Sequence, residues 1–175
     1  MILPIVAYGH PVLKAIAAPI TPDYPELDEL LANMWETLAH SEGVGLAAPQ
    51  VNKSIRLFIV DGNPFYPDYP AAKDFKQVFI NAELIEAFGD EVSFKEGCLS
   101  LPNIYEEVIR PDKIRIKYLD EQFQEHEEVF EASVPASSSM NTTICKVMSM
   151  STALRHYARP CCKVNYVPSR KANVT

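Results

Sequence analysis

Hydrophobic and polar positions in the first 131 residues follow two periods, one typical of a helix and one typical of strands. Between residues 24 and 40, apolar side chains recur at helical spacing and acidic residues lie on the opposite face, which predicts an amphipathic helix with one buried face. The apolar positions are Leu27, Leu30, Leu31, Met34, Trp35 and Leu38. We interpret this stripe as core, and His40 as an exposed residue at the helix end.

Five short segments have the apolar and β-branched runs that are typical of strands. They span residues 54–60, 77–80, 91–94, 113–119 and 127–130. The string Asp-Gly-Asn-Pro at residues 61–64 ends the first of them with turn chemistry. Short strands and one long helix predict an α+β fold, with small mixed or antiparallel β-sheets around a central helix.

The pattern changes after Glu131. Residues 132–143 are rich in Ser, Pro, Thr and Asn and follow neither period, and residues 144–175 contain no convincing amphipathic element. We therefore expect a domain over residues 1–131 and an irregular, poorly ordered tail over residues 132–175.

Composition narrows the class of protein. A chain of 175 residues that is 47% hydrophobic can bury one sizeable core. Its 16 basic and 23 acidic residues give a net charge of -7, which argues against a nucleic-acid-binding surface. No segment is long and apolar enough to span a bilayer, and the start has no basic leader. The four cysteines, two of them adjacent, make a poor disulfide framework, so we expect a cytoplasmic protein.

Two segments have candidate chemistry, and the first is Gly-Val-Gly-Leu-Ala-Ala-Pro-Gln at residues 43–50. Its glycines let a backbone approach a ligand closely. A Gly-x-Gly fragment alone is more often a tight turn under a sheet, but the full string is far more specific. It lacks the spacing of a dinucleotide fingerprint or a phosphate loop, which argues against nucleotide binding.

The second segment is Glu-Gly-Cys-Leu-Ser-Leu-Pro at residues 96–102, with a single Cys98 beside a glycine. A thiolate is a good ligand for zinc or iron. A lone cysteine is more often a small buried hydrophobe. Cys98 is therefore a candidate metal ligand because it occurs together with the first segment.

Together these strings resemble the first two signature motifs of the peptide deformylases, and Tyr-Gly-His-Pro-Val-Leu at residues 8–13 resembles that family's N-terminal segment. The resemblance covers residues 1 to about 131. It implies removal of the formyl group from the N-terminal formyl-Met of nascent polypeptides, with the ribosome as a place of encounter. It also implies a divalent metal, Fe²⁺ in most of the family with Zn²⁺ as the alternative, held by one Cys and two His.

The resemblance assigns roles to individual residues. Cys98 matches the Cys ligand of the metal, whose bound water attacks the formyl carbon. The side-chain amide of Gln50 and the backbone N–H of Leu99 match the donors to the developing oxyanion. Gly43, Val44 and Gly45 would pair with the substrate backbone as an added strand.

The family's third motif, His-Glu-x-x-His on a helix, is absent. His126 is followed by Glu127, but no second histidine comes at the required spacing, and we interpret His126 as an exposed strand residue. His10 belongs to an N-terminal turn, and His156 matches nothing in the family. Two metal ligands and the catalytic Glu are therefore missing, so it is open whether this chain is an enzyme.

A one-base deletion explains the break. Residues 131–143 can be back-translated so that one G restored after the Glu131 codon gives Glu-Gly-Phe-Cys-Ala-Arg-Val-Ile-Gln-His-Glu-Tyr-Asp-His, with Ile144 completing the last codon. The codons of Met140 and Asn141 force the Glu codon of the restored motif, whereas the third bases of most other codons are free. Our hypothesis is a deletion near Ala132, either genuine or a sequencing error.

Three functions stay open at this point. The first is a peptide deformylase, impaired as written. The second is a non-catalytic remnant that binds N-terminal peptides. The third, with irregular spacing against it, is a small metal-binding module built from Cys145, His156, Cys161 and Cys162.

Overall fold

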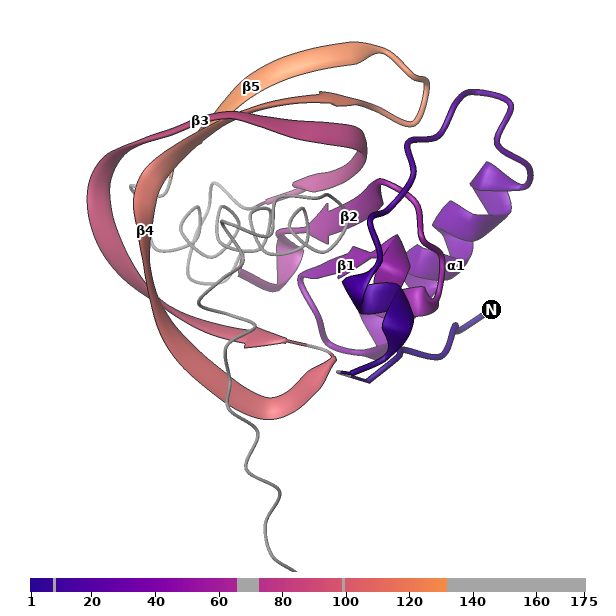
Figure 1. Cartoon of the computed structure of the whole chain (residues 1–175), viewed down its shortest axis with the longest axis horizontal. Coiled ribbons are helices and arrows are strands. Elements are labelled where there is room, and N and C mark those ends of the chain that lie inside the picture. The colour runs from indigo at the N-terminus through magenta and orange to yellow at the C-terminus, as the bar shows by residue number, and fades with distance from the viewer. Residues whose placement is uncertain (8, 66–72, 99, 132–175) are drawn as a thin grey trace, which may run out of the picture.

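The computed structural model describes residues 1–7, 9–65, 73–98 and 100–131. Within them lie one α-helix and a five-stranded antiparallel sheet in the order β1-β2-β3-β4-β5 (Figure 1). The predicted α+β class is confirmed. The predicted tail, residues 132–175, lies outside the described residues, so the boundary after Glu131 stays a prediction.

The elements follow one another as a helical first third and a β-rich remainder. The first part contains a short 3-10 helix η1 (Pro11–Lys14), helix α1 (Leu27–His40), strand β1 (Gly45–Ala47) and a second 3-10 helix η2 (Ala48–Val51). Then come β2 (Leu57–Asp61), a turn of 3-10 helix η3 (Asn63–Phe65), β3 (Lys76–Cys98), β4 (Leu101–Leu119) and β5 (Glu125–Glu131). The predicted helix and all five predicted strand segments overlap with these elements.

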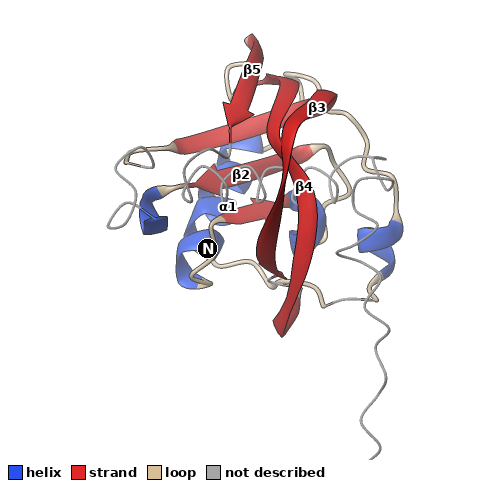
Figure 2. Ribbon diagram, turned by 90° about the vertical axis from the view of Figure 1, so that its left-hand side faces the viewer, coloured by secondary structure: helices blue, strands red, loops and turns tan. Residues whose placement is uncertain are grey.

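Strand β3 unites two segments that the sequence pattern separates. Its backbone takes a positive φ at Asn81 (52°) and Gly89 (93°), and the register with β4 shifts beside both. The positive φ of Gly89 favours glycine, and a Cβ there would lie 1.9 Å from Asp112 Oδ1, so any other residue would also have to displace the Asp112 carboxylate. These irregularities act as β-bulges that bend the strand without ending it. The long β3–β4 pair curls round in Figure 1 and is seen as a twisted band in Figure 2.

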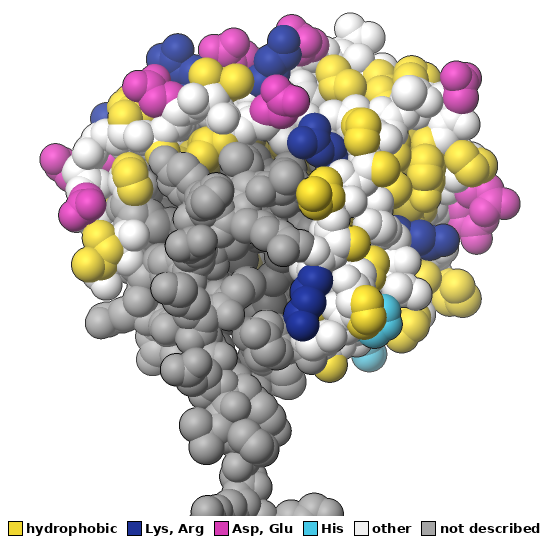
Figure 3. Space-filling model, viewed as in Figure 1, with side chains coloured by type: hydrophobic (Ala, Val, Ile, Leu, Met, Phe, Trp, Pro, Cys, Tyr) yellow, Lys and Arg dark blue, Asp and Glu magenta, His cyan; other side chains and the backbone are white. Residues whose placement is uncertain are grey.

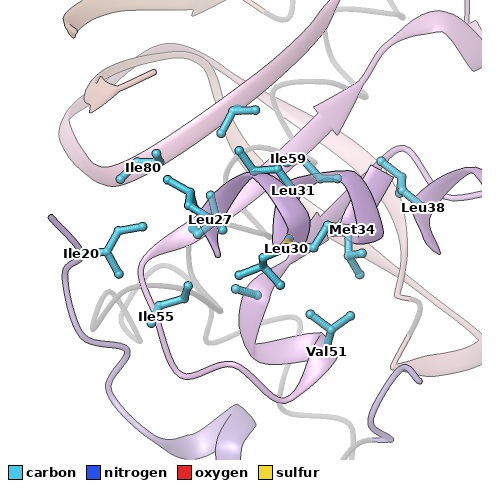
Figure 4. Close-up of a cluster of buried hydrophobic side chains, with 14 residues drawn as sticks. Ile20, Leu27, Leu30, Leu31, Met34, Leu38, Val51, Ile55, Ile59 and Ile80 are labelled. Atoms are coloured by element: carbon cyan, nitrogen blue, oxygen red, sulfur yellow. The ribbon is translucent and has the colours of Figure 1, made fainter. Parts of the chain in front are cut away.

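Helix α1 covers one face of the sheet because its apolar stripe meets the inward residues of β1 and β2. Met34 is 0% exposed and Leu38 1% exposed, and both belong to a cluster with Leu46, Leu57 and Ile59 (Figure 4). Trp35 is partly buried and packs against this cluster. The predicted core face of the helix is confirmed.

The opposite face of the sheet holds a second, aromatic cluster. The ring of Phe79 lies 4.6 Å from the ring of Phe58, nearly parallel to it, and 4.6 Å from the ring of Tyr118. Ile114 and Ile116 of β4 complete the buried set. Alternate residues of each strand therefore feed two separate cores, as the two-residue period of a strand dictates.

The segment before α1 is tied to the sheet by one side chain. Asn81 Oδ1 accepts a hydrogen bond from the Ile20 N–H at 2.9 Å, and Asn81 Nδ2 donates to the Ile20 carbonyl at 2.8 Å. Next to it, Arg56 N–H donates to the Ala18 carbonyl at 2.8 Å. Asn81 thus acts on Ile20 as a neighbouring strand would, with one donor and one acceptor.

Ion pairs follow the outer surface of β4 and β5. Lys113 pairs with Glu131 at 3.1 Å and Lys117 with Glu125 at 2.9 Å. Acidic and basic side chains alternate along the upper margin of Figure 3, the side on which Figure 1 places β5. In the part of the chain that the structure describes, no helix is both long and apolar enough to cross a membrane.

Candidate functional site

The segment of residues 43–50 leaves helix α1 and forms one edge of the sheet. The Gly43 N–H closes the helix end by donating to the Leu38 carbonyl at 3.3 Å. Strand β1 starts at Gly45, so Gly43 and Val44 lie just before it. Among the described strands, β1 pairs with β2 alone.

Pairing with β2 decides which backbone groups of this edge point away from the sheet. The Asp61 N–H donates to the Val44 carbonyl at 2.9 Å, which makes these two residues a hydrogen-bonded pair. Because bonded and non-bonded pairs alternate along antiparallel strands, the N–H and C=O of Gly45 point away from β2. An extended peptide can bond to those two groups.

Gln50 is buried at the end of η2, with 2% of its surface exposed. Its Oε1 accepts a hydrogen bond from the Ala47 N–H at 2.9 Å, so the side chain reaches back over the first turn of η2 as in half of a capping box. With the oxygen engaged, Nε2 points away from η2 and donates to Ser100 Oγ at 3.3 Å. The amide is therefore oriented, with its donor end facing the Ser100 side.

The contact between Gln50 and Ser100 joins the two segments singled out by sequence. Strand β3 ends at Cys98 and β4 starts at Leu101, and Cys98 and Leu101 are register partners. Only two residues connect them, so the tip of this hairpin is tight. Ser100, 4% exposed, lies in that tip and brings it against η2. Leu99 lies outside the described residues, and for Cys98 the structure places the backbone.

The described residues do not complete a family-type metal site. Within the described residues, no group of three or more His, Cys, Asp or Glu side chains could hold a metal ion. The Nδ1 of His10 accepts from the Val12 N–H at 3.3 Å, and His40 is exposed at the end of α1. The sequence offers no His-Glu-x-x-His string to add ligands to Cys98. The four residues of the metal-module interpretation lie outside the described part.

His126 is placed differently from its prediction. It lies in β5 as expected, but it is half-buried rather than exposed: its Nε2 lies 2.8 Å from Asp120 Oδ2, and its ring stacks on Tyr118 at 5.3 Å. The turn between β4 and β5 brings Asp120 back toward the strand, which the local pattern does not reveal.

A second candidate is a polar cleft of about 420 Å³ between α1 and the β4–β5 turn, lined by Trp35, Lys76, Gln77, Val78, Asp120, Glu121 and Gln122. The ammonium of Lys76 lies 4.4 Å from the centre of the Trp35 ring, and Gln77 donates to the Tyr118 hydroxyl. Partial burial by itself raises the pKa of Asp120, but hydrogen bonds with His126 and with backbone N–H groups together outweigh it and lower that pKa. These groups bind one another, which makes the cleft a weaker candidate than the Gln50 site.

Sequence reasoning missed Ser100 and the Ala47 N–H. Ser100 stands two residues after Cys98 within the quoted string, but a serine in a turn gives no sign of a long-range contact. The two hydrogen bonds of Gln50 link residues 3 and 50 positions apart, so only the folded chain reveals the pair.

Comparisons with known proteins agree on one family. Residues 2–136 match the family model described as polypeptide deformylase. The chain is 49% identical over 141 residues to the peptide deformylase of Flavobacterium johnsoniae, covering 77% of this chain and 72% of that protein. It is 47% identical over 137 residues to that of Christiangramia forsetii, covering 74% and 70%.

Solved structures agree with the sequence comparisons. The Acinetobacter baumannii class I type b peptide deformylase with Met-Ala-Ser bound superposes with a TM-score of 0.73 at 31% identity, covering 89% of this chain and 98% of that one. The Thermotoga maritima peptide deformylase gives a TM-score of 0.71 at 30% identity, covering 89% and 97%.

Proposed function

The chain belongs to the polypeptide deformylase family, and we propose that its site binds the formyl-Met end of nascent polypeptides, with formyl removal impaired in the chain as written. One observation carries the proposal: the buried amide of Gln50 is oriented toward the hairpin tip that follows Cys98, and the neighbouring strand β1 has β2 as its single partner among the described strands. Because ribosomes make such substrates in the cytoplasm, we propose that the protein acts there.

The edge of β1 is the proposed place for the peptide backbone. The N–H and C=O of Gly45 would exchange hydrogen bonds with an extended peptide, and Gly43 and Val44 would flank it. Main-chain pairing of this kind provides affinity that is independent of side-chain sequence. A protein that acts on many nascent chains needs that property. The Acinetobacter baumannii relative, solved with Met-Ala-Ser, supports this class of ligand.

Gln50 is proposed to bind the formyl oxygen. When the formyl carbon is attacked, negative charge develops on that oxygen, and a donor already in position stabilises it without reorganisation. The Leu99 backbone N–H is proposed as a second donor. Loss of one such donor in hydrolases typically costs about 3 kcal/mol in the transition state.

The metal is the missing part. In the family, Fe²⁺ or Zn²⁺ supplies the attacking water, but Cys98 alone does not make a metal centre. We therefore expect formyl removal at least about a thousandfold slower than in a chain with the full motif, because metal and acid–base Glu are main catalytic contributors.

A one-base deletion after the Glu131 codon remains the proposed cause. The match to the family model ends at residue 136, close to that point, which supports it. The gene sequence is the direct test: codons for residues 132–144 that cannot be reread as His-Glu-Tyr-Asp-His would exclude the deletion.

Metal content, peptide binding and turnover should be measured on two proteins, the chain as written and the product of the gene with one G restored after the Glu131 codon. We expect the written chain to bind formyl-Met-Ala-Ser without stoichiometric iron or zinc and with negligible formate release. The restored product is expected to bind metal and release formate. Equal turnover by both would refute the impairment.

The alternatives give different results in the same assay. A metal-binding module would retain metal when Cys98 is replaced and lose it when Cys161 and Cys162 are replaced. A written chain that binds neither formylated nor free peptide would refute the proposed binding function.

A further inference from the structure

The hydroxyl of Ser100 has no role in the function proposed so far, yet its place is unusual. It lies in the two-residue tip of the β3–β4 hairpin, is 4% exposed, and accepts a hydrogen bond from the Nε2 of Gln50 at 3.3 Å. Gln50 itself is 2% exposed. Two buried polar side chains, 50 positions apart in sequence, thus meet at the proposed binding site.

A primary amide carries two N–H groups on one nitrogen, and only one of them can face the oxygen of a bound formyl group. The second must find another acceptor or stay unpaired, and an unpaired buried donor is costly. The long side chain of glutamine can also rotate. Anchoring Oε1 on the Ala47 N–H at 2.9 Å limits that rotation but does not fix where both hydrogens of Nε2 point.

We propose that Ser100 is a positioning residue for Gln50. Its hydroxyl takes one of the two Nε2 hydrogens, so that the other is held toward the formyl oxygen of a peptide on the β1 edge. Ala47 and Ser100 then hold the amide from both ends. The inference rests on the proposed function, because the formyl oxygen of the proposed substrate is the acceptor for the second Nε2 hydrogen.

The hydroxyl suits this role because it accepts from Gln50 and keeps its own hydrogen free to turn away. A purely structural role would predict something different. If Ser100 only stabilised the hairpin tip, its loss would lower stability and weaken all peptides alike, whereas a positioning role changes the preference for the formyl group.

The test uses the full chain with Ser100→Ala, Ser100→Thr, and Ser93→Ala as the control on the same hairpin. Ser93 is exposed and lies in β3 opposite Ile109. The first readout is the pair of side-chain amide proton–nitrogen signals of Gln50, assigned by their loss in Gln50→Glu. We expect Ser100→Ala to shift these signals, Ser100→Thr to restore them, and Ser93→Ala to leave them unchanged.

The second readout is the ratio of the dissociation constants of Met-Ala-Ser and formyl-Met-Ala-Ser. Loss of a hydrogen bond that orients a donor should reduce the preference for the formylated peptide roughly two- to tenfold. Ser100→Thr should recover it because it keeps the hydroxyl.

The outcomes distinguish a failure of the Ser100 positioning role from a failure of the proposed function. Gln50 signals that do not change in Ser100→Ala overturn the positioning role, whatever the peptides do. Shifted signals with an unchanged formyl preference also overturn it, since the amide would then be held for no substrate. A wild-type chain without any preference for the formylated peptide refutes the proposed function itself, and with it the target of the second hydrogen.

Discussion

Replacing Asn81 by alanine tests how the segment before α1 is held to the sheet. Asn81 combines a left-handed backbone, with φ of 52°, and two hydrogen bonds to the Ile20 backbone at 2.9 and 2.8 Å. Alanine would lose both bonds, at about 1 kcal/mol each, and would tolerate the left-handed backbone less well, at about 1 kcal/mol. We expect Asn81→Ala to lower the free energy of unfolding by about 3 kcal/mol.

Asn52 provides a matched control. It also has a left-handed backbone, with φ of 63°, but it is exposed at the end of η2. Asn52→Ala should therefore cost only the backbone part, about 1 kcal/mol. Urea unfolding followed by far-UV circular dichroism and Trp35 fluorescence measures both variants. Equal losses in the two would refute the claim that the Asn81 side chain holds the segment.

Three further predictions concern the β-rich half. Burial, then the charge of Glu128, raises the pKa of Tyr118 from the ordinary tyrosine value of 10.0; in an absorbance titration Tyr118 should ionise above that value, and ionisation at it would contradict its burial. Partial burial raises the pKa of Asp120, but hydrogen bonds, first with His126, outweigh it and lower that pKa from 3.8. The stability that Asp120 contributes should be present above pH 3.8 and lost as pH falls through its lower folded-state pKa. Asp120→Asn should therefore make the urea midpoint fall less steeply between about pH 5 and about pH 2. An unchanged slope would contradict the lowered pKa of Asp120. Phe79→Leu should cost about 2 kcal/mol in urea unfolding because ring contacts at 4.6 Å with Phe58 and Tyr118 are lost, and a loss below about 0.5 kcal/mol would contradict the packing.

Local periodicity was sufficient to predict α1, because one continuous apolar stripe decides both its existence and its buried face. It was insufficient for β3, which the pattern divides at residues 81–90. Asn81 and Gly89 are the residues that usually mark turns, and here their positive φ values produce bulges inside one strand. Whether such a residue ends a strand or bends it depends on the partner strand, which sequence alone does not display.

The candidate site was also predictable only in part. The two strings around Gln50 and Cys98 were sufficient to predict the family, because they are long and specific. The orientation of the Gln50 amide was not predictable, since it depends on the Ala47 backbone and on a serine 50 positions away. Periodicity did not reveal strand β1, because three residues ending in a proline-containing turn are too few to show a period; the family resemblance implied a strand edge at residues 43–45, and the strand runs from Gly45 to Ala47.

The open side of β1 has a cost of its own. Among the described strands β1 has β2 as its single partner, and a strand edge that can pair with an extended peptide can also pair with the edge strand of another protein molecule, a contact that starts aggregation. Two features limit this hazard: β1 has only 3 residues, and Pro49 in the following turn of η2 has no N–H to continue a ladder. In the proposed function this edge holds the first residues of a peptide, and its 3 residues are too few to template a sheet between copies. Lengthening β1 would therefore trade solubility for peptide affinity.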